Sequence, residues 1–287
     1  CLLGFDASLY VTAQPKTRGL ATAKQWPCPG EMLTLESEEV RLDTRSGKFN
    51  APPAGLAYGF VQANLVILPA ANAKDNLVYC QHDPKPCPLL GISAPGDTGI
   101  ARLGKNLSIA TDLPRYRVWH NSELSEECAD VSHLWRDDLV SFALGFSLSF
   151  ERALLEQGLE LRHLTRGCNV SRYRTKVPTQ ETSQLHGQLV VSMRPFTPAD
   201  PIWAIQVTSR FPEVHGAPVH SGDPSLLIGI KDLGKPDYGD AADIKEDEFP
   251  SSGLAVSRRN RCSWQACLYS ASPVGQVQRQ ISCWGLI

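Results

Sequence analysis

The chain alternates between short apolar runs and short amphipathic segments from about residue 52 onward. The run "VQANLVILP" (61–69) is almost continuously apolar and predicts a buried strand, and "HGQLVVSMRP" (186–195) predicts a second one. Between them, "AANAKDNLVYCQ" has the spacing of a helix, and "DLPRYRVW" (112–119) leads into a short strand. Because strands and helices mix without an internal repeat, the pattern favours an α/β fold of the mixed α+β kind.

Glycines mark where several predicted helices end. The segment "LTLESEEVRLDTRSGKF" predicts a helix with an acidic start that ends at Gly47. The segments "DDLVSFALG" and "FERALLEQG" predict two helical pieces around Gly145, the second of which ends at Gly158. We therefore expect helix on both sides of Gly145.

Prolines delimit the elements around the most polar loop of the chain. The segment "TPADPIWAIQVTSRFP" predicts a helix with Thr197 as its N-cap, Pro198 at its first position and Pro212 as its stop. After the loop, "SLLIGI" (225–230) predicts a buried strand.

Composition and charge argue against several classes of function. The formal net charge is −2 and no block of Lys and Arg occurs, so we expect no nucleic-acid partner. The longest apolar stretch, 139–150, is too short to span a bilayer, so we expect no membrane segment. Nine cysteines without a C-x-x-C pair argue against a zinc ribbon and are typical of reduced thiols inside the cell.

The loop "RFPEVHGAPVHSGDP" gathers titratable side chains within a turn-forming sequence. His215 and His220 flank a glycine and a proline, and Asp223 follows three residues later. Histidines suit proton transfer near neutrality, so these three are our candidate catalytic residues, with the carboxylate orienting an acid/base pair. They could equally form a metal-binding facial triad, or bond the backbone of their own loop. We assign no metal ligands and leave the cofactor open.

Arginines and two serines are the candidate substrate-binding residues. A guanidinium group meets a carboxylate with two parallel hydrogen bonds. Two polar side chains inside the apolar run "GFSLSFE" must find partners and are candidates to line a pocket, with Glu151 as a possible base. His163 and Asn169 are weaker pocket candidates. The predicted substrate-binding set is Arg115, Arg117, Arg194, Arg210, Ser147 and Ser149.

The order of the short motifs is similar to that of a known family. The runs "GFVQANLVILP", "CQHDPKPCPLL", "TDLPRYRVW", "DDLVSFALGFSLSFE", "VVSMRP", "QVTSRFPEVHGAPVHSGDP" and "IGIKDLGKPDYGD" together resemble the D-glutamate cyclase family of hydro-lyases over about residues 45–250. The resemblance implies a two-lobed α/β catalytic unit that closes D-glutamate to 5-oxo-D-proline with loss of water. It assigns no catalytic residues, and Cys168 stands where the family usually has arginine.

Three functions compete at this point. The leading one is a hydro-lyase that dehydrates D-glutamate or a related small amino acid, which would be its small-molecule partner. The alternatives are a metal-dependent lactam or amide hydrolase built on the two histidines and the aspartate, and a carboxylate-binding protein that is no enzyme. Homo-oligomerisation stays open.

The ends of the chain depart from the family pattern. Residues 1–31 lack periodicity, so we divide the chain into a leader, a hydro-lyase domain at 32–250 and a tail at 251–287. We expect a cytoplasmic protein, with a mitochondrial location as the alternative because Lys16, Arg18 and Lys24 suit a transit peptide. The codons of "FPSSGLAVSRR" (249–259) can, in a shifted register, spell the family run "PVFWACGVTP", so we interpret the tail as a shifted reading frame that impairs this chain.

Overall fold

The chain forms a mixed α/β structure, which confirms the predicted fold class. The computed structural model describes residues 36–50, 56–57, 59–120, 123–197, 200–221, 224–227, 229–242 and 244, and the backbone of 262–267, 272–273 and 280–286. Within these residues, every strand pair is antiparallel.

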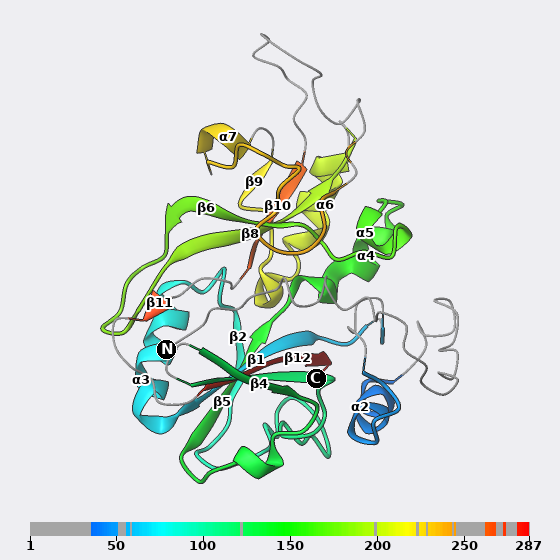
Figure 1. Cartoon of the computed structure of the whole chain (residues 1–287). Helices are drawn as coiled ribbons and strands as arrows, with labels where there is room; N and C mark the ends of the chain where they lie inside the picture. Colours follow the sequence, from blue (N-terminus) through cyan, green and yellow to red (C-terminus); the bar gives the residue numbers. More distant parts are fainter. Residues whose placement is uncertain are drawn as a thin grey trace, which may run out of the picture.

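Two main sheets organise the described residues (Figure 1). The six-stranded sheet has the order β2 (Leu89–Ile92), β5 (Leu139–Gly145), β1 (Gln62–Pro69), β12 (Gln280–Leu286), β3 (Arg115–His120) and β4 (Glu123–Cys128). The four-stranded sheet has the order β6 (Arg172–Pro178), β8 (Gln188–Pro195), β10 (Cys262–Cys267) and β9 (His220–Ser221). A two-stranded sheet pairs β11 (Ser272–Pro273) with β7 (Leu185–His186).

Short helices connect and flank these sheets. The α-helices are α2 (Ser37–Arg45), α3 (Ala70–His82), α4 (Glu151–Glu156), α5 (Arg162–Thr165), α6 (Asp200–Thr208) and α7 (Pro224–Leu227). The 3-10 turns are η2 (Ser132–Leu134), η3 (Ser147–Phe150) and η4 (Pro212–Val214). In Figure 1, α4 and α5 lie beside the junction between the two main sheets.

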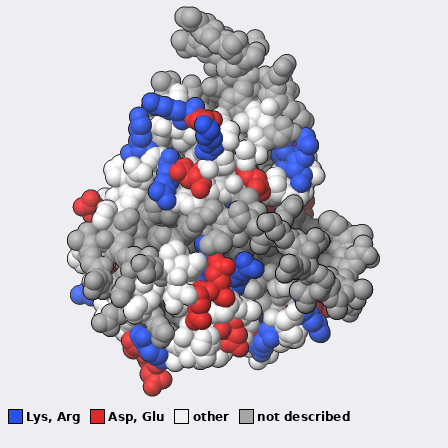
Figure 2. All heavy atoms as spheres, in the orientation of Figure 1, with Lys and Arg blue, Asp and Glu red and all other residues white. Residues whose placement is uncertain are grey.

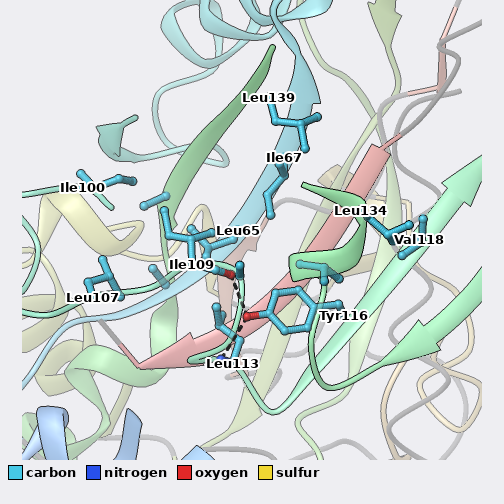
Figure 3. Packing of buried hydrophobic residues seen from close by; sticks show 14 of the residues in the cluster. Leu65, Ile67, Ile100, Leu107, Ile109, Leu113, Tyr116, Val118, Leu134 and Leu139 are labelled. Atoms are coloured by element: carbon cyan, nitrogen blue, oxygen red, sulfur yellow. Dashed lines mark hydrogen bonds between the residues drawn. The ribbon is translucent and has the colours of Figure 1, made fainter. Parts of the chain in front are cut away.

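Strand β1 is buried along its whole length because both faces of its sheet are covered. Leu65 and Ile67 point into a cluster with Tyr116, shown in Figure 3, and the alternate residues face a second cluster with Tyr79 of α3. The hydroxyl of Tyr116 donates to the carbonyl of Ile109 at 2.7 Å, which satisfies its polar end inside the core. The continuous apolar run that predicted this strand is therefore explained by two-sided packing.

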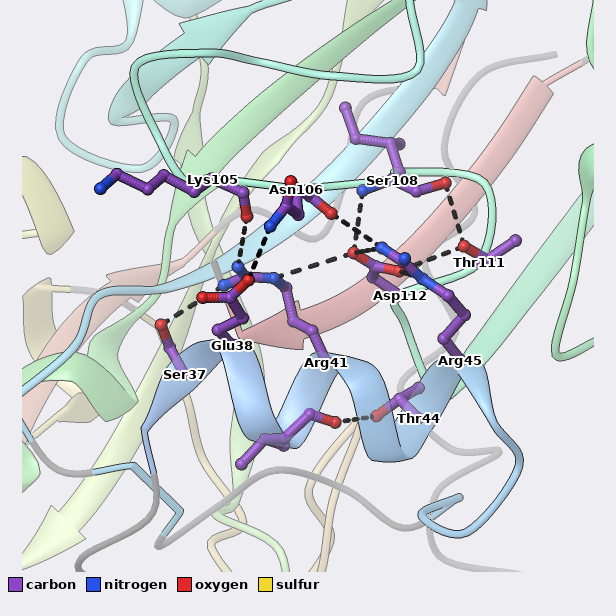
Figure 4. A network of polar contacts seen from close by, with 12 residues as sticks. Ser37, Glu38, Arg41, Thr44, Arg45, Lys105, Asn106, Ser108, Thr111 and Asp112 are labelled. Atoms are coloured by element: carbon purple, nitrogen blue, oxygen red, sulfur yellow. Dashed lines mark hydrogen bonds and ion pairs between the residues drawn. The ribbon is translucent and has the colours of Figure 1, made fainter.

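A buried ion-pair network fixes α2 to the loop before β3 (Figure 4). The carboxylate of Asp112 has no exposed side-chain surface and accepts two hydrogen bonds from Arg45, at 2.7 and 2.9 Å. Arg41 approaches the same carboxylate at 3.7 Å and donates to the carbonyl of Lys105. The helix predicted before Gly47 is confirmed, and Gly47 has a φ of 74°, in the left-handed region that glycine favours.

Two predicted elements are wrong. Residues 139–145 form strand β5 instead of a helix, inserted between β1 and β2 with every residue buried. A short apolar run has the same composition in a buried strand and in a buried helix, so its period could not separate them. "SLLIGI" is no strand either, because Pro224 to Leu227 form the single turn α7, and Gly229 follows with a φ of 77°. Proline at the first helical position and glycine after the last one favour that turn.

The tail contributes backbone to both main sheets. Strand β12 lies between β1 and β3, and β10 lies between β8 and β9. The side chains of the tail lie outside what the structure describes, so the shifted reading frame and the domain boundary at residue 250 stay predictions.

The charges visible on one face of the molecule agree with the balanced composition. In the view of Figure 2, Lys and Arg lie interspersed with Asp and Glu, without a large patch of one sign. Among the described residues, no helix combines the length and the apolar character that a membrane crossing needs.

Candidate active site

A fully buried carboxylate lies at the start of α4. Glu151 Oε1 is 2.7 Å from the Nη2 atom of Arg194 on β8 and 2.9 Å from the Nε2 atom of His163 on α5. Burial alone would raise the pKa of Glu151, but the charges of His163 and Arg194, together with the hydrogen bond from Arg194, hold that pKa below its ordinary value. The approach of His163 is poorly aligned for a hydrogen bond, so we regard it mainly as an electrostatic contact. Glu151 is therefore a buried anion at neutral pH.

Arg194 is the cation that this anion holds in place. Its side chain is 3% exposed, and Nη1 lies 3.2 Å from the hydroxyl of Ser192 while Nη2 lies 3.4 Å from that of Ser147. The guanidinium group also lies over the ring of Phe150, 5.6 Å from its centre. The Nε atom is buried and has no hydrogen-bond partner among the described residues.

His215 is a buried, neutral base. Its Nδ1 atom lies 2.9 Å from the carbonyl oxygen of Lys85, and because a carbonyl can only accept, the proton is on Nδ1. Desolvation is the main cause that lowers the pKa of His215 to about 4, against the hydrogen bond to Lys85 and with help from the charge of Arg194. The lone pair is consequently on Nε2, which is buried without a partner in the described part of the chain.

The backbone at His215 is strained, and the turn before it packs closely against β5. Its φ of 82° is in the left-handed region, which histidine rarely adopts, and such strain concentrates at functional sites. The preceding turn packs on β5, where a Cβ added to Gly145 would lie 2.1 Å from the carbonyl oxygen of Glu213. Only glycine allows this approach, so Gly145 sets the position of the turn that carries His215.

Two cavities lie near the buried cluster, and neither Arg194 nor His215 is among the residues that line them. A cavity of about 510 Å³ is formed by residues 59–61, α4 and residues 210–214. A cavity of about 220 Å³ is lined by α5, by residues 168–171 and by Asp240. His163 lines this second cavity, and its ring also contacts Glu151.

The structure brings some of the predicted site residues together. Arg194 and Ser147 meet in the buried cluster, and the charge of Arg194 reaches His215. Arg210 and Ser149 both line the 510 Å³ cavity, although the Ser149 hydroxyl is occupied by the backbone of residues 62 and 146.

Other predicted residues lie elsewhere. Arg115 and Arg117 share one face of β3, as their spacing predicts, but both pair with Glu127 on β4, at 3.6 and 2.8 Å. Strands β1 and β12 separate β3 from β5. His220 is half-buried on β9, and Asp223 lies outside the described residues.

Sequence reasoning missed Ser192 and the carbonyl of Lys85. The signal for Ser192 was a hydroxyl inside the apolar strand "VVSMRP", two residues before Arg194 and therefore on the same face. The role of Lys85 depends on a contact 130 residues along the chain, which no local pattern carries.

A metal centre finds no support among the described residues. No group of three or more His, Cys, Asp or Glu side chains gathers there in a way that could hold an ion. The site region contains a buried ion pair and a neutral imidazole, and Asp223 of the predicted triad lies outside the described residues.

Comparison with known proteins gives the family. The family model described as D-glutamate cyclase matches residues 140–252. A protein of Bordetella pertussis is 58% identical over 218 residues, which are 76% of this chain and 78% of that protein. A protein of Methylobacterium sp. strain 4-46 is 54% identical over 77% of this chain and 82% of its own length. A protein of Bradyrhizobium diazoefficiens is 51% identical over 80% of this chain and 83% of its own length. All three are named "putative hydro-lyase". The chain belongs to the D-glutamate cyclase family.

We predict that Glu151→Gln destabilises the protein by about 3 kcal/mol, because it leaves the charge of Arg194 buried and uncompensated. Urea unfolding followed by circular dichroism measures the loss. The matched control on the same helix is Glu156→Gln, whose ion pair with Arg152 is half exposed and should contribute at most about 1 kcal/mol. Equal unfolding midpoints for the two variants would contradict the prediction, and an apolar double replacement of Glu151 and Arg194 should recover most of the loss.

We predict that His215 makes the protein less stable in acid. Its pKa of about 4 in the folded state lies below the ordinary 6.5, so the unfolded chain binds the proton more readily. Stability is unaffected by this group above pH 6.5 and falls by about 3 kcal/mol between pH 6.5 and pH 4. His215→Asn keeps a donor for the Lys85 carbonyl and tolerates a positive φ, and it should flatten this part of the curve.

The matched control for this prediction is His120→Asn, which changes an exposed histidine and should leave the acid slope as it is. Urea unfolding at a series of pH values gives the slope for each variant. An unchanged slope in His215→Asn would count against a buried neutral imidazole.

Proposed function

We propose that the protein is a hydro-lyase that dehydrates D-glutamate to 5-oxo-D-proline. The observation that carries the proposal is the unprotonated Nε2 atom of His215, which is buried and lies within electrostatic reach of Arg194. Family membership supports the reaction class, since the matching family model is described as D-glutamate cyclase.

The reaction joins the amino group of glutamate to its own γ-carboxyl group. A C–N bond forms and a C–O bond breaks, and two protons move from the ammonium nitrogen to the departing oxygen, which leaves as water. The attacking amine must be neutral, so a base has to remove a proton first. His215 Nε2 can accept this proton because it carries none at neutral pH. Its lowered pKa makes it a weak base, which returns the proton readily to the departing oxygen.

Arg194 suits the stabilisation of negative charge. The γ-carboxyl carbon becomes a tetrahedral centre with a charged oxygen, which needs a donor fixed in advance. The Nε atom of Arg194 has no hydrogen-bond partner among the described residues, and Glu151 fixes the guanidinium orientation through Nη2. In this proposal Glu151 is a positioning residue, and its charge prevents Arg194 from being an uncompensated cation in the apo protein.

We predict that the protein turns over D-glutamate, and not L-glutamate, to 5-oxoproline, and that His215→Asn reduces kcat by at least about 100-fold. Chiral chromatography after incubation with each enantiomer measures both effects. His120→Asn should keep the activity of the parent. Equal turnover of the two enantiomers, or full activity without the imidazole, would refute the assignment.

We further propose that the tail after residue 250 is read in a shifted frame and impairs this chain. The family model match ends at residue 252, which supports this interpretation. We predict that restoring the frame from codon 249 raises both the melting temperature and the dehydration rate, because the family run is richer in apolar side chains. The coding DNA for residues 245–287 gives the first check. No gain on restoration would contradict the shifted frame.

A further inference from the structure

The 510 Å³ cavity is lined in part by the turn that leads into His215. Residues 59–61 form one wall, α4 forms a second, and residues 210–214 form the third. Its lining is mainly apolar apart from four charged side chains and one hydroxyl. The apolar lining residues are Phe60, Val61, Ala153, Phe211, Pro212 and Val214.

The four charged side chains differ in whether they are already paired. Arg152 and Glu156 are one helical turn apart on α4 and form an ion pair at 2.7 Å. Arg210 and Glu213 are exposed, and their side chains form no hydrogen bond or ion pair within the described residues, including with each other. The cavity therefore offers one uncommitted cation and one uncommitted anion three residues apart, Arg210 shortly after α6 and Glu213 in η4.

We propose that this cavity is a recognition site for the zwitterionic end of an α-amino acid. Arg210 binds the α-carboxylate through its planar guanidinium group, and Glu213 binds the α-ammonium group. The choice of glutamate as the ligand rests on the proposed function. The expectation of a ligand with one negative and one positive group rests on Arg210 and Glu213 of the cavity, which are unpaired among the described residues. The apolar wall accommodates the methylene groups of the side chain.

This arrangement distinguishes the substrate from the product. D-Glutamate has both an α-carboxylate and an ammonium group, but 5-oxoproline keeps only the carboxylate, because its nitrogen has become a neutral amide. Product formation therefore removes the contact to Glu213 and keeps the contact to Arg210. The loss of one charged contact favours release of the product over retention.

One wall of the cavity and the buried base belong to the same turn. Val214 lines the cavity and is followed directly by His215, and the carbonyl of Glu213 packs against Gly145. An amino acid held by Arg210 and Glu213 thus contacts the same turn that positions the imidazole.

The test is equilibrium binding, which is independent of turnover. Isothermal titration calorimetry is done with D-glutamate, glutarate and 5-oxo-D-proline, where glutarate is the inert dicarboxylate that lacks the ammonium group. D-Glutamate is titrated into variants made on the His215→Asn background. We expect Glu213→Gln to weaken D-glutamate about tenfold and to leave the other two ligands within about twofold. Arg210→Gln should weaken all three about tenfold.

The matched control is Arg136→Gln, which removes an exposed arginine whose partner is Asp138 and should change no affinity. Circular dichroism checks that each variant is folded. Unchanged affinities in the Arg210 and Glu213 variants, or no binding of D-glutamate to the parent, would overturn the proposed site. If the affinities change as expected but no 5-oxoproline is formed, the recognition site stands and the proposed reaction fails.

Discussion

The ion pair between Glu151 and Arg194 is the interaction on which the candidate site depends. Removing a carboxylate from water is costly unless a counter-charge lies within contact distance, and Glu151 has two cationic or ionisable neighbours in Arg194 and His163. The pair joins α4, which follows β5 of the six-stranded sheet, to β8 of the four-stranded sheet. One electrostatic contact therefore links α4 to the four-stranded sheet and fixes a guanidinium group whose charge reaches the imidazole of His215.

The position of the turn that carries His215 is determined by close packing and not by charge. A glycine at the end of β5 lets the carbonyl of Glu213 approach closer than any side chain would allow. The imidazole is then held by the carbonyl of Lys85, which also decides which nitrogen carries the proton. A positive φ at a histidine is unfavourable, and it persists because these contacts on both sides determine the backbone.

The tail shows how differently backbone and side chains depend on sequence. Its strands β10 and β12 occupy interior positions in two sheets through main-chain hydrogen bonds, which almost any residue can form. Filling a core requires particular side-chain volumes, which a shifted reading frame would not preserve. A segment of the tail can therefore pair as a strand within a sheet even if its side chains were not selected to pack there.

The sequence by itself determined the elements whose signals are local. Strand β1, helix α3, strand β8 and helix α4 follow from apolar runs, helical spacing and a terminal glycine, and the family follows from the order of short motifs. The sequence also singled out Arg194 and His215, because few residue types suit their chemistry. It did not separate strand β5 from a helix, since the partners β1 and β2 that make it a strand are distant in the chain. Only the tertiary structure placed Arg115 and Arg117 against Glu127, because an arginine has the same sequence signal whether it binds a substrate or a neighbouring strand. The unprotonated Nε2 atom of His215 was likewise decided by folding, since burial and a distant carbonyl set both its pKa and its tautomer.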